Sequence, residues 1–224
     1  MRDVYYEHLR AIVDDVVRLT GWVRRALASA TLALLEADRR LAELVIDGDD
    51  RIDQLTTDIE ERVFTLMATQ QPVAGDLRQL VATLRIIADL ERIGDLAVHV
   101  AKVARMREPE SAVPDRMQPT IRSMARVADA MIEAVAHVVA ERDVVAAADL
   151  ERRDDELDEL HRRLFSKVLS DSWPHGVEAA IDLALLSRYY ERIGDHAVSL
   201  ARRLVFQVTG ARAGQTMESL SGSV

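Results

Sequence analysis

The feature that most constrains the fold of this chain is an internal repeat. The pentapeptide Glu-Arg-Ile-Gly-Asp occurs at residues 91–95 and again at residues 191–195, and three small apolar residues follow it in register in both places. A weaker match precedes it, because acidic and apolar residues between 36 and 55 recur 105 positions later. Chance explains an identical pentapeptide at matching places poorly. We therefore predict a duplicated unit, with a shorter second copy that lacks residues between 160 and 191.

Each copy has the apolar spacing of α-helices. In the first copy, one apolar stripe runs from Leu77 to Ile87 and a second from Ile86 to Val100, both at spacings of three or four residues. Aromatic residues make up only 4% of the chain, with nine Gly and five Pro, which favours helices over a β-sandwich or barrel. Two stripes on one helix predict contact with more than one neighbour, as in a bundle. The fold class is predicted to be all-α.

Turn residues divide the chain into helices and domains. Pro72 with Gly75, the Pro-bracketed segment 109–114, and the turn Asp171–Gly176 are the main breaks, whereas the pattern around Gly48 stays helical. The simplest architecture is two tandem three-helix bundles, a first at 1–108 and a second at 115–209, joined by a linker at 109–114 and followed by a flexible tail at 210–224. The six helices are expected at residues 3–38, 40–70, 75–107, 115–142, 145–170 and 175–208.

The charge balance and the residue types that are missing exclude several classes of function. The net charge is −9 and the sequence pI is near 5.2, whereas nucleic-acid binding requires a basic footprint. The chain has no cysteine, which excludes disulfides, thiolate zinc sites and cysteine nucleophiles. The first residues contain no apolar signal region, and the longest wholly apolar stretch, Val144–Ala148, is far too short to cross a bilayer. We expect a cytoplasmic protein that neither inserts into membranes nor binds nucleic acid.

Four pairs of acidic residues are the candidate functional groups. Members of a pair stand four positions apart and share one helix face, where like charges repel unless something neutralises them. Folding back about Pro72 would set the first two pairs at the same height on adjacent helices, and the turn near Trp173 would do the same in the second copy. Convergent carboxylates suit a divalent cation or a small metal cluster. The candidate metal ligands are Asp49, Asp53, Glu91, Asp95, Asp154, Asp158, Glu191 and Asp195.

A simpler interpretation of these residues is a solvated helix face. Arg92 and Arg192 would then pair with the carboxylates across each hairpin. Gly94 and Gly194 favour the metal site somewhat. A glycine inside a helix lowers helix stability by about 1 kcal/mol relative to alanine, so its presence indicates that a neighbouring helix approaches closely beside the acidic pairs.

Two histidines are further candidate ligands, whereas the known catalytic signatures are missing. His99 and His161 have ligand spacing to Asp95 and Asp158, although a surface histidine is the commoner case. The inward Glu-x-x-His pairs of di-iron bundles, a phosphate-binding glycine loop and a Ser/His/Asp constellation are all missing from the sequence. We therefore expect no enzyme.

The two Glu-Arg-Ile-Gly-Asp segments, together with the segment Pro72–Arg78 before the first, resemble the PhoU family. These regulators accompany the bacterial phosphate-specific transport system. The resemblance covers about residues 1–210, and the Asp171–Gly176 turn and the ending Phe206–Gly210 look most like actinobacterial members. It implies two three-helix bundles related by a pseudo-twofold axis. The segment Pro72–Arg78 has no counterpart after Pro174, which puts functional equivalence of the two copies in doubt.

The resemblance also implies function, partners and ligands. Family members act as negative regulators of the phosphate-starvation response, and couple the transporter's ATPase subunit to a phosphate-sensing histidine kinase. Some bind iron, zinc, manganese or magnesium through Glu/Asp-x-x-x-Asp motifs, which correspond to the four acidic pairs named above, and homodimers are expected. Our hypothesis is that the acidic faces, bare or bridged by metal, dock basic surfaces of the two partners. The alternatives are a carboxylate-metal hydrolase or oxidase, an ion-free helical adaptor, and a metal-binding helical protein outside phosphate control.

Overall fold

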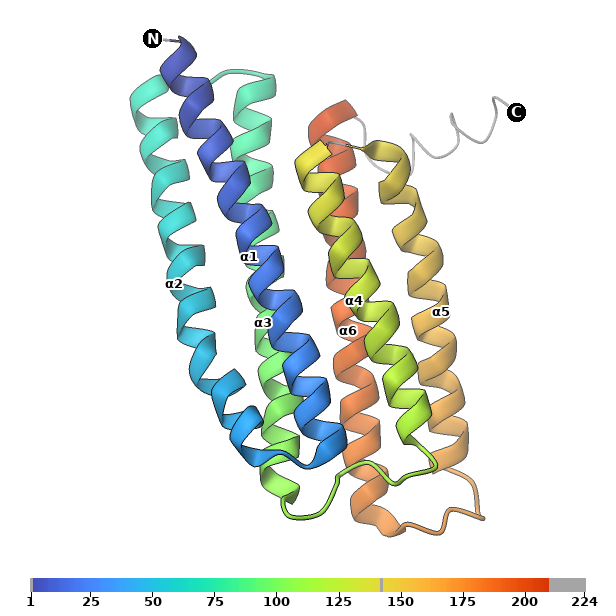
Figure 1. The fold of residues 1–224 in the computed structure, drawn as a ribbon. Coiled ribbons are helices and arrows are strands. Elements are labelled where there is room, and N and C mark those ends of the chain that lie inside the picture. Colours follow the sequence, from blue (N-terminus) through green and yellow to red (C-terminus); the bar gives the residue numbers. More distant parts are fainter. Residues whose placement is uncertain (1, 142, 210–224) are drawn as a thin grey trace, which may run out of the picture.

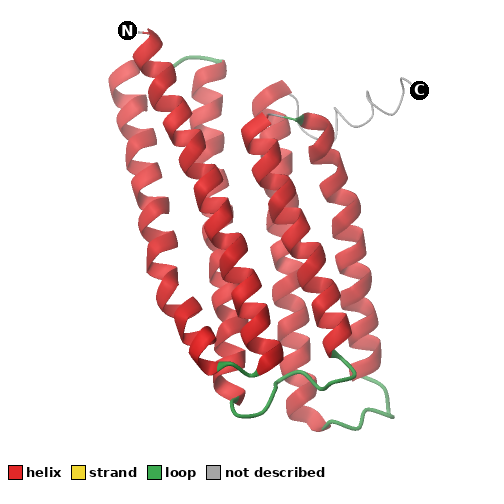
Figure 2. Cartoon of the chain, viewed as in Figure 1, coloured by secondary structure: helices red, strands yellow, loops and turns green. Residues whose placement is uncertain are grey.

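The chain folds into two three-helix bundles that lie side by side. The structure is a computed structural model that describes residues 2–141 and 143–209. The first bundle contains α1 (Arg2–Glu36), α2 (Arg39–Gln70) and α3 (Gly75–Arg107), and the second contains α4 (Gln118–Glu141), α5 (Val144–Val168) and α6 (Gly176–Thr209). Figure 1 shows that α2 and α5 lie at opposite outer edges. Figure 2 shows that the described residues form helices joined by short connections, with no strand. The predicted all-α architecture of two tandem bundles is confirmed.

Helix boundaries follow local signals in the sequence. Asp38 caps α2, since its side chain accepts a hydrogen bond of 2.9 Å from the backbone N–H of Leu41. Beyond the C-terminus of α2, Gln71 adopts a left-handed conformation before Pro72, which ends that helix. Gly176, with φ of 77°, supplies the backbone conformation that precedes α6.

The expected helix ends are close to the observed ones, with one clear difference. We expected the first helix of the second bundle to begin at residue 115, but α4 begins at Gln118. Residues 115–117 form a turn instead, because the backbone N–H groups of Met117 and Gln118 both donate to the carbonyl of Pro114. The stretch around Gly48 lies inside α2, as predicted. The domain limits stay a prediction, and the expected tail at 210–224 lies outside the described residues.

The two bundles share one hydrophobic core through α3 and α6. Helix α3 packs against α1, α2 and α6, and α6 packs against α3, α4 and α5. Each of these central helices therefore has several neighbours, as their multiple apolar stripes predicted. Tyr190 of α6 is fully buried between the bundles, where its hydroxyl lies 2.7 Å from Thr31 Oγ1 of α1. Within the described residues, no helix is long and apolar enough to cross a membrane.

Ion pairs tie the two bundles together at their interface. Arg24 of α1 contacts Asp129 and Glu133 of α4, each at 2.6 Å. Arg107 at the end of α3 makes a two-pronged contact with the buried carboxylate of Asp182 on α6, at 2.6 and 3.1 Å. These pairs have fixed geometry, so they hold α1 and α3 in register with α4 and α6.

Candidate functional site

The first acidic cluster forms where α2 and α3 face each other. Its members are Asp49 and Asp53 on α2 and Glu91 and Asp95 on α3. Burial raises the pKa of Asp49 to about 6, and the charges of Asp53 and Asp95 add to the effect. Burial and the charge of Asp53 likewise raise the pKa of Glu91. The carboxylates of each helix therefore raise pKa values on the other helix, as expected for a hairpin about Pro72.

The second acidic cluster repeats the arrangement between α5 and α6. Its members are Asp154 and Asp158 on α5 and Glu191 and Asp195 on α6. Burial raises the pKa of Asp154 to about 6, and Asp158 and Asp195 contribute repulsion. Burial and Asp195 also raise the pKa of Glu191, against the opposing effect of Arg188. The pseudo-repeat thus places one acidic cluster on each bundle.

Gly94 and Gly194, at equivalent positions of the repeat, let the facing helices approach at these carboxylates. A Cβ atom added at Gly94 would lie 3.7 Å from Oδ1 of Asp49, which is ordinary contact. A Cβ atom added at Gly194 would lie 2.7 Å from Oδ1 of Asp154 and 2.8 Å from a methyl carbon of Leu157. The predicted close approach is present in both bundles, and it is tighter in the second.

Arginines neutralise the clusters from their own helices. Arg92 contacts Asp95 one turn along α3 at 2.8 Å, and Arg188 contacts Glu191 in the same way on α6. Our alternative interpretation had Arg92 reaching across the hairpin, which is wrong in this structure. Because Arg92 points along α3, the carboxylates of α2 receive no such partner from it.

The two histidines behave differently from each other. His99 is exposed and stacks on Tyr189 of α6 with ring centroids 5.3 Å apart, so it contacts the other bundle. His161 is half-buried against Phe165, and its Nδ1 atom is buried without a hydrogen-bond partner among the described residues. Its charge opposes the raised pKa of Glu191, which places it near the second cluster.

The clusters match the chemistry of a hard cation in their donor atoms. All eight predicted ligands offer carboxylate oxygens, and Oδ1 of Asp49 is buried without a hydrogen-bond partner in the described part of the chain. As the side chains are arranged, no three His, Asp or Glu residues among those described stand close enough together to hold a metal ion. The carboxylates are thus of the right donor type and lie on facing helices, but holding an ion would require their side chains to move closer together.

A second feature lies outside the residues that the sequence singled out. A groove of 780 Å³ runs between the start of α3 and the end of α6, and four arginines are among its lining residues. The sequence contains a signal for this groove in the positions where the two copies differ. Arg78 and Arg85 of the first copy correspond to Glu178 and Leu185 of the second, and the repeat was recognised from identical residues only. The arginines are Arg78, Arg85, Arg202 and Arg203.

Comparisons with known proteins point to one family. A model of the PhoU domain matches residues 16–104 and 121–204, one match in each bundle. The phosphate-specific transport system accessory protein PhoU homolog 2 of Mycobacterium tuberculosis is 44% identical over 211 residues, covering 94% of this chain and 99% of that protein. The PhoU homolog of Caulobacter vibrioides is 33% identical, covering 92% and 90%.

Solved structures agree with these matches. The crystal structure of PhoU from Pseudomonas aeruginosa has a TM-score of 0.83 at 29% identity, covering 92% of this chain and all of that one. The phosphate transport system regulatory protein PhoU from Streptococcus pneumoniae has a TM-score of 0.84 at 22% identity, covering 93% and 99%, and shows the shared fold.

Proposed function

Because this chain belongs to the PhoU family, we propose that it is a cytoplasmic, non-catalytic regulator of phosphate transport. In this role it represses the phosphate-starvation response and links the transporter's ATPase subunit to a phosphate-sensing histidine kinase. The observation that carries the proposal is the tandem family match, which spans both bundles and includes all eight acidic residues. The relatives named as phosphate transport accessory proteins support it.

The acidic clusters supply a docking mechanism. Each bundle carries one acidic cluster, and the whole chain has a net charge of −9. Basic surfaces of partner proteins are therefore attracted to the clusters. When a partner protein binds one conformation of this protein more tightly than another, it shifts the population toward that conformation. By the same coupling, a change of conformation in this protein alters its affinity for the partner. Phosphate supply thereby reaches the kinase as a change in partner binding.

Calorimetry of the purified protein with the transporter's ATPase subunit tests this proposal. We expect saturable binding that weakens from low to moderate salt, because attraction between exposed charges is screened. The variant E91Q/D95N/E191Q/D195N is expected to bind more weakly and to lose the phosphate response in cells. A control that removes the same charge from exposed sites outside the clusters is D14N/E61Q/E110Q/D171N. Equal affinity of wild type and cluster variant, with an unchanged phosphate response, would contradict the docking role.

Metal binding is a second candidate function, with a role outside phosphate control. It is favoured by the buried oxygen of Asp49, which has no hydrogen-bond partner among the described residues, and by the burial and the repulsion from Asp53 and Asp95 that raise the pKa of Asp49. Bound iron, zinc, manganese or magnesium would supply positive charge that offsets this repulsion, and Asp53 and Asp95, whose charges act on Asp49, are the further donors. Thermal melts before and after chelation test it. A melting temperature that falls with chelator and recovers with one metal supports the site, and D49N/D53N should abolish that response. Identical melts would leave an ion-free adaptor.

Homodimer formation is part of the same proposal and rests on the family alone. Sedimentation velocity of the full chain at several concentrations measures it directly. A single monomer boundary at all concentrations would contradict the dimer without affecting the adaptor role.

A further inference from the structure

The groove between the two bundles has an apolar floor that is open to solvent. It is bounded by the first three turns of α3 and by the last turns of α6, which belong to different copies of the repeat (Figure 1). Leu77 and Phe206 in its lining are 38% and 39% exposed, and Val81 between them is half-buried. Large apolar side chains that gather in a groove and stay exposed are typical of binding sites.

Arginines flank this floor from both sides. Arg78 and Arg85 on α3 are exposed, and neither has an ion-pair partner among the described residues. On the α6 side, Arg202 contacts Glu151 at 2.9 Å and Arg203 contacts Asp89 at 3.0 Å. Among the described residues that line the groove, Asp195 is the single acidic one. A locally basic groove on a chain with net charge −9 calls for an acidic ligand.

The duplicated copy shows that these arginines are not a requirement of the fold. One hundred positions after Arg78 and Arg85, at the start of α6, stand Glu178 and Leu185. Arg107 at the end of α3 crosses to that position and pairs with Glu178 and Asp182. The pseudo-equivalent end of the interface is thus closed by ion pairs, whereas the end at Arg78 and Arg85 is left open.

The shape of the groove selects the kind of partner. It lies along α3 from Ala74 to Arg85, which is about 16 Å or three helical turns. The walls are helices whose backbone groups already bond within each helix, and no sheet edge occurs among the described residues. The groove therefore offers no strand for an extended segment to pair with, whereas an α-helix brings its backbone hydrogen bonds with it and needs only side-chain contacts.

We propose that this groove receives an amphipathic α-helix of a partner protein, with its apolar stripe on Leu77, Val81 and Phe206. Glutamate or aspartate residues beside that stripe pair with Arg78 and Arg85. The proposal goes beyond the docking function of the acidic clusters, because it assigns a surface of opposite charge, which borders the second cluster at Asp195.

Two designed helical peptides test the proposal by fluorescence anisotropy with the full chain. Both carry leucines at helical spacing over three turns; one has glutamates beside the leucines, and the other has lysines. We expect saturable binding of the glutamate peptide and binding at least about tenfold weaker for the lysine peptide. The variant R78E/R85E should reverse this preference. V81W, which fills the floor without changing charge, should weaken the glutamate peptide at least about tenfold.

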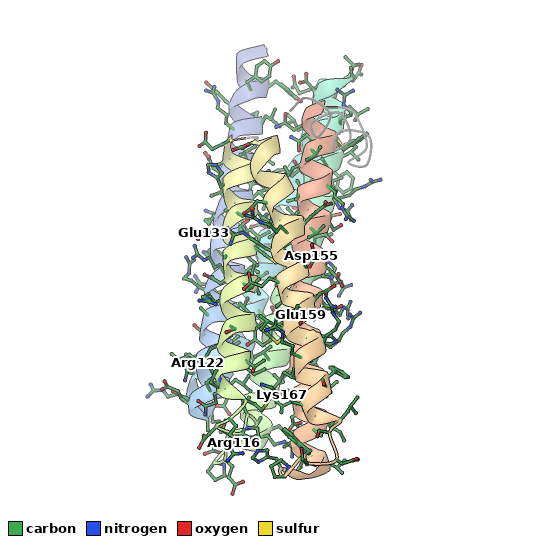
Figure 3. All side chains as sticks on the ribbon, turned by 90° about the vertical axis from the view of Figure 1, so that its right-hand side faces the viewer. Arg116, Arg122, Glu133, Asp155, Glu159 and Lys167 are labelled. Carbon is green, nitrogen blue, oxygen red and sulfur yellow. The ribbon has the colours of Figure 1, made fainter. Side chains whose placement is uncertain are left out.

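A matched charge reversal on another face controls for the general field of the protein. Arg116 and Arg122 are exposed at the other end of the second bundle, on the face that Figure 3 shows with charges of both signs. R116E/R122E changes the net charge by the same amount and should bind the glutamate peptide within about twofold of wild type. Circular dichroism melts of every variant confirm that the fold is retained.

Several results would overturn the proposal. These are no binding of the glutamate peptide, equal binding of both peptides, or equal loss in R116E/R122E and R78E/R85E. Binding of ATP or inorganic polyphosphate that R78E/R85E abolishes, without peptide binding, would assign the groove to a small anion instead. Self-association that R78E/R85E abolishes, again without peptide binding, would assign it to a second copy of this chain.

Discussion

In the first bundle, a methyl group added at Gly94 would stand at ordinary contact distance from Asp49, whereas in the second bundle a methyl group added at Gly194 would collide with Asp154. The same five-residue motif therefore sits in two different packings. The first cluster has Arg92 and Lys102 as opposing charges, while the second has Arg188 and His161. Duplication has preserved the acidic pairs, but each copy has acquired its own way of surrounding them.

The copies differ more at their ends than at their acidic clusters. At one end of the interface between α3 and α6, Arg107 and Asp182 form an ion pair that closes the gap between the helices. At the other end, Arg78 and Arg85 are left exposed beside an open groove. A pseudo-twofold fold can therefore carry two unlike surfaces, because residues on the outer rim of the interface are free to diverge.

The largest expected effect comes from exchanging a core residue between the copies. Tyr190 and Leu90 occupy equivalent positions and both are fully buried. Tyr190→Leu removes the hydroxyl contact with Thr31 and leaves a cavity, which should lower the free energy of unfolding by about 3 kcal/mol. Tyr190→Phe is the matched control and should cost about 1 kcal/mol. Urea unfolding measures both; equal losses would show that the cavity contributes nothing.

The glycine pair provides the next test. Gly94→Ala gains helix propensity and meets Ile52 at 3.4 Å and Asp49 at 3.7 Å, whereas Gly194→Ala must displace Asp154 and Leu157. We expect Gly194→Ala to be less stable than Gly94→Ala by about 1–2 kcal/mol in urea unfolding. If the two variants are equally stable, the packing around the two clusters does not differ in energy.

The acidic clusters themselves should respond alike to pH. In chelator-treated protein at pH 7.5, Asp49→Asn and Asp154→Asn should each raise the free energy of unfolding by about 1 kcal/mol, after allowance for solvent screening. The reason is that folding raises the pKa of each aspartate to about 6.

The sign of this pH dependence follows from proton binding. Between pH 4 and pH 6 the folded state holds more protons than the unfolded state, so wild-type stability from these groups is greatest below pH 4 and falls as the pH rises through 6. The advantage of each variant should therefore shrink at pH 4. Asp47→Asn, at an exposed site on α2, is the control. An advantage of equal size at both pH values would contradict the raised pKa.

The smallest effect is expected at the exposed arginines. Arg92 is 64% exposed and its partner Asp95 is 36% exposed, so Arg92→Gln should change the free energy of unfolding by less than about 0.5 kcal/mol. Arg188→Gln should cost more, because its partner Glu191 is only 14% exposed. Thermal melts in low salt are sensitive enough to rank the two, and the reverse order would show that the clusters are equally solvated.

Much of the acidic site was predictable from local sequence. The four-residue spacing of Glu91 and Asp95 fixes them on one helix face, and the turn at Pro72 fixes which carboxylates of α2 they meet. The direction of Arg92 was predicted wrongly as an alternative, because a long side chain reaches several carboxylates from one position and packing decides between them. The stacking of His99 on Tyr189 could not be predicted from the sequence, because packing between the two bundles decides it.

By itself the sequence determined the helices, their duplication, and the hairpins that gather acidic pairs in each copy. These features follow from spacing within one helix or from neighbours separated by a short turn. Only the tertiary structure decided how the two bundles lie against each other, and hence that Arg78 faces the end of α6, more than one hundred residues away. The physical reason is that apolar periodicity specifies which face of a helix is buried, but not which distant helix covers it.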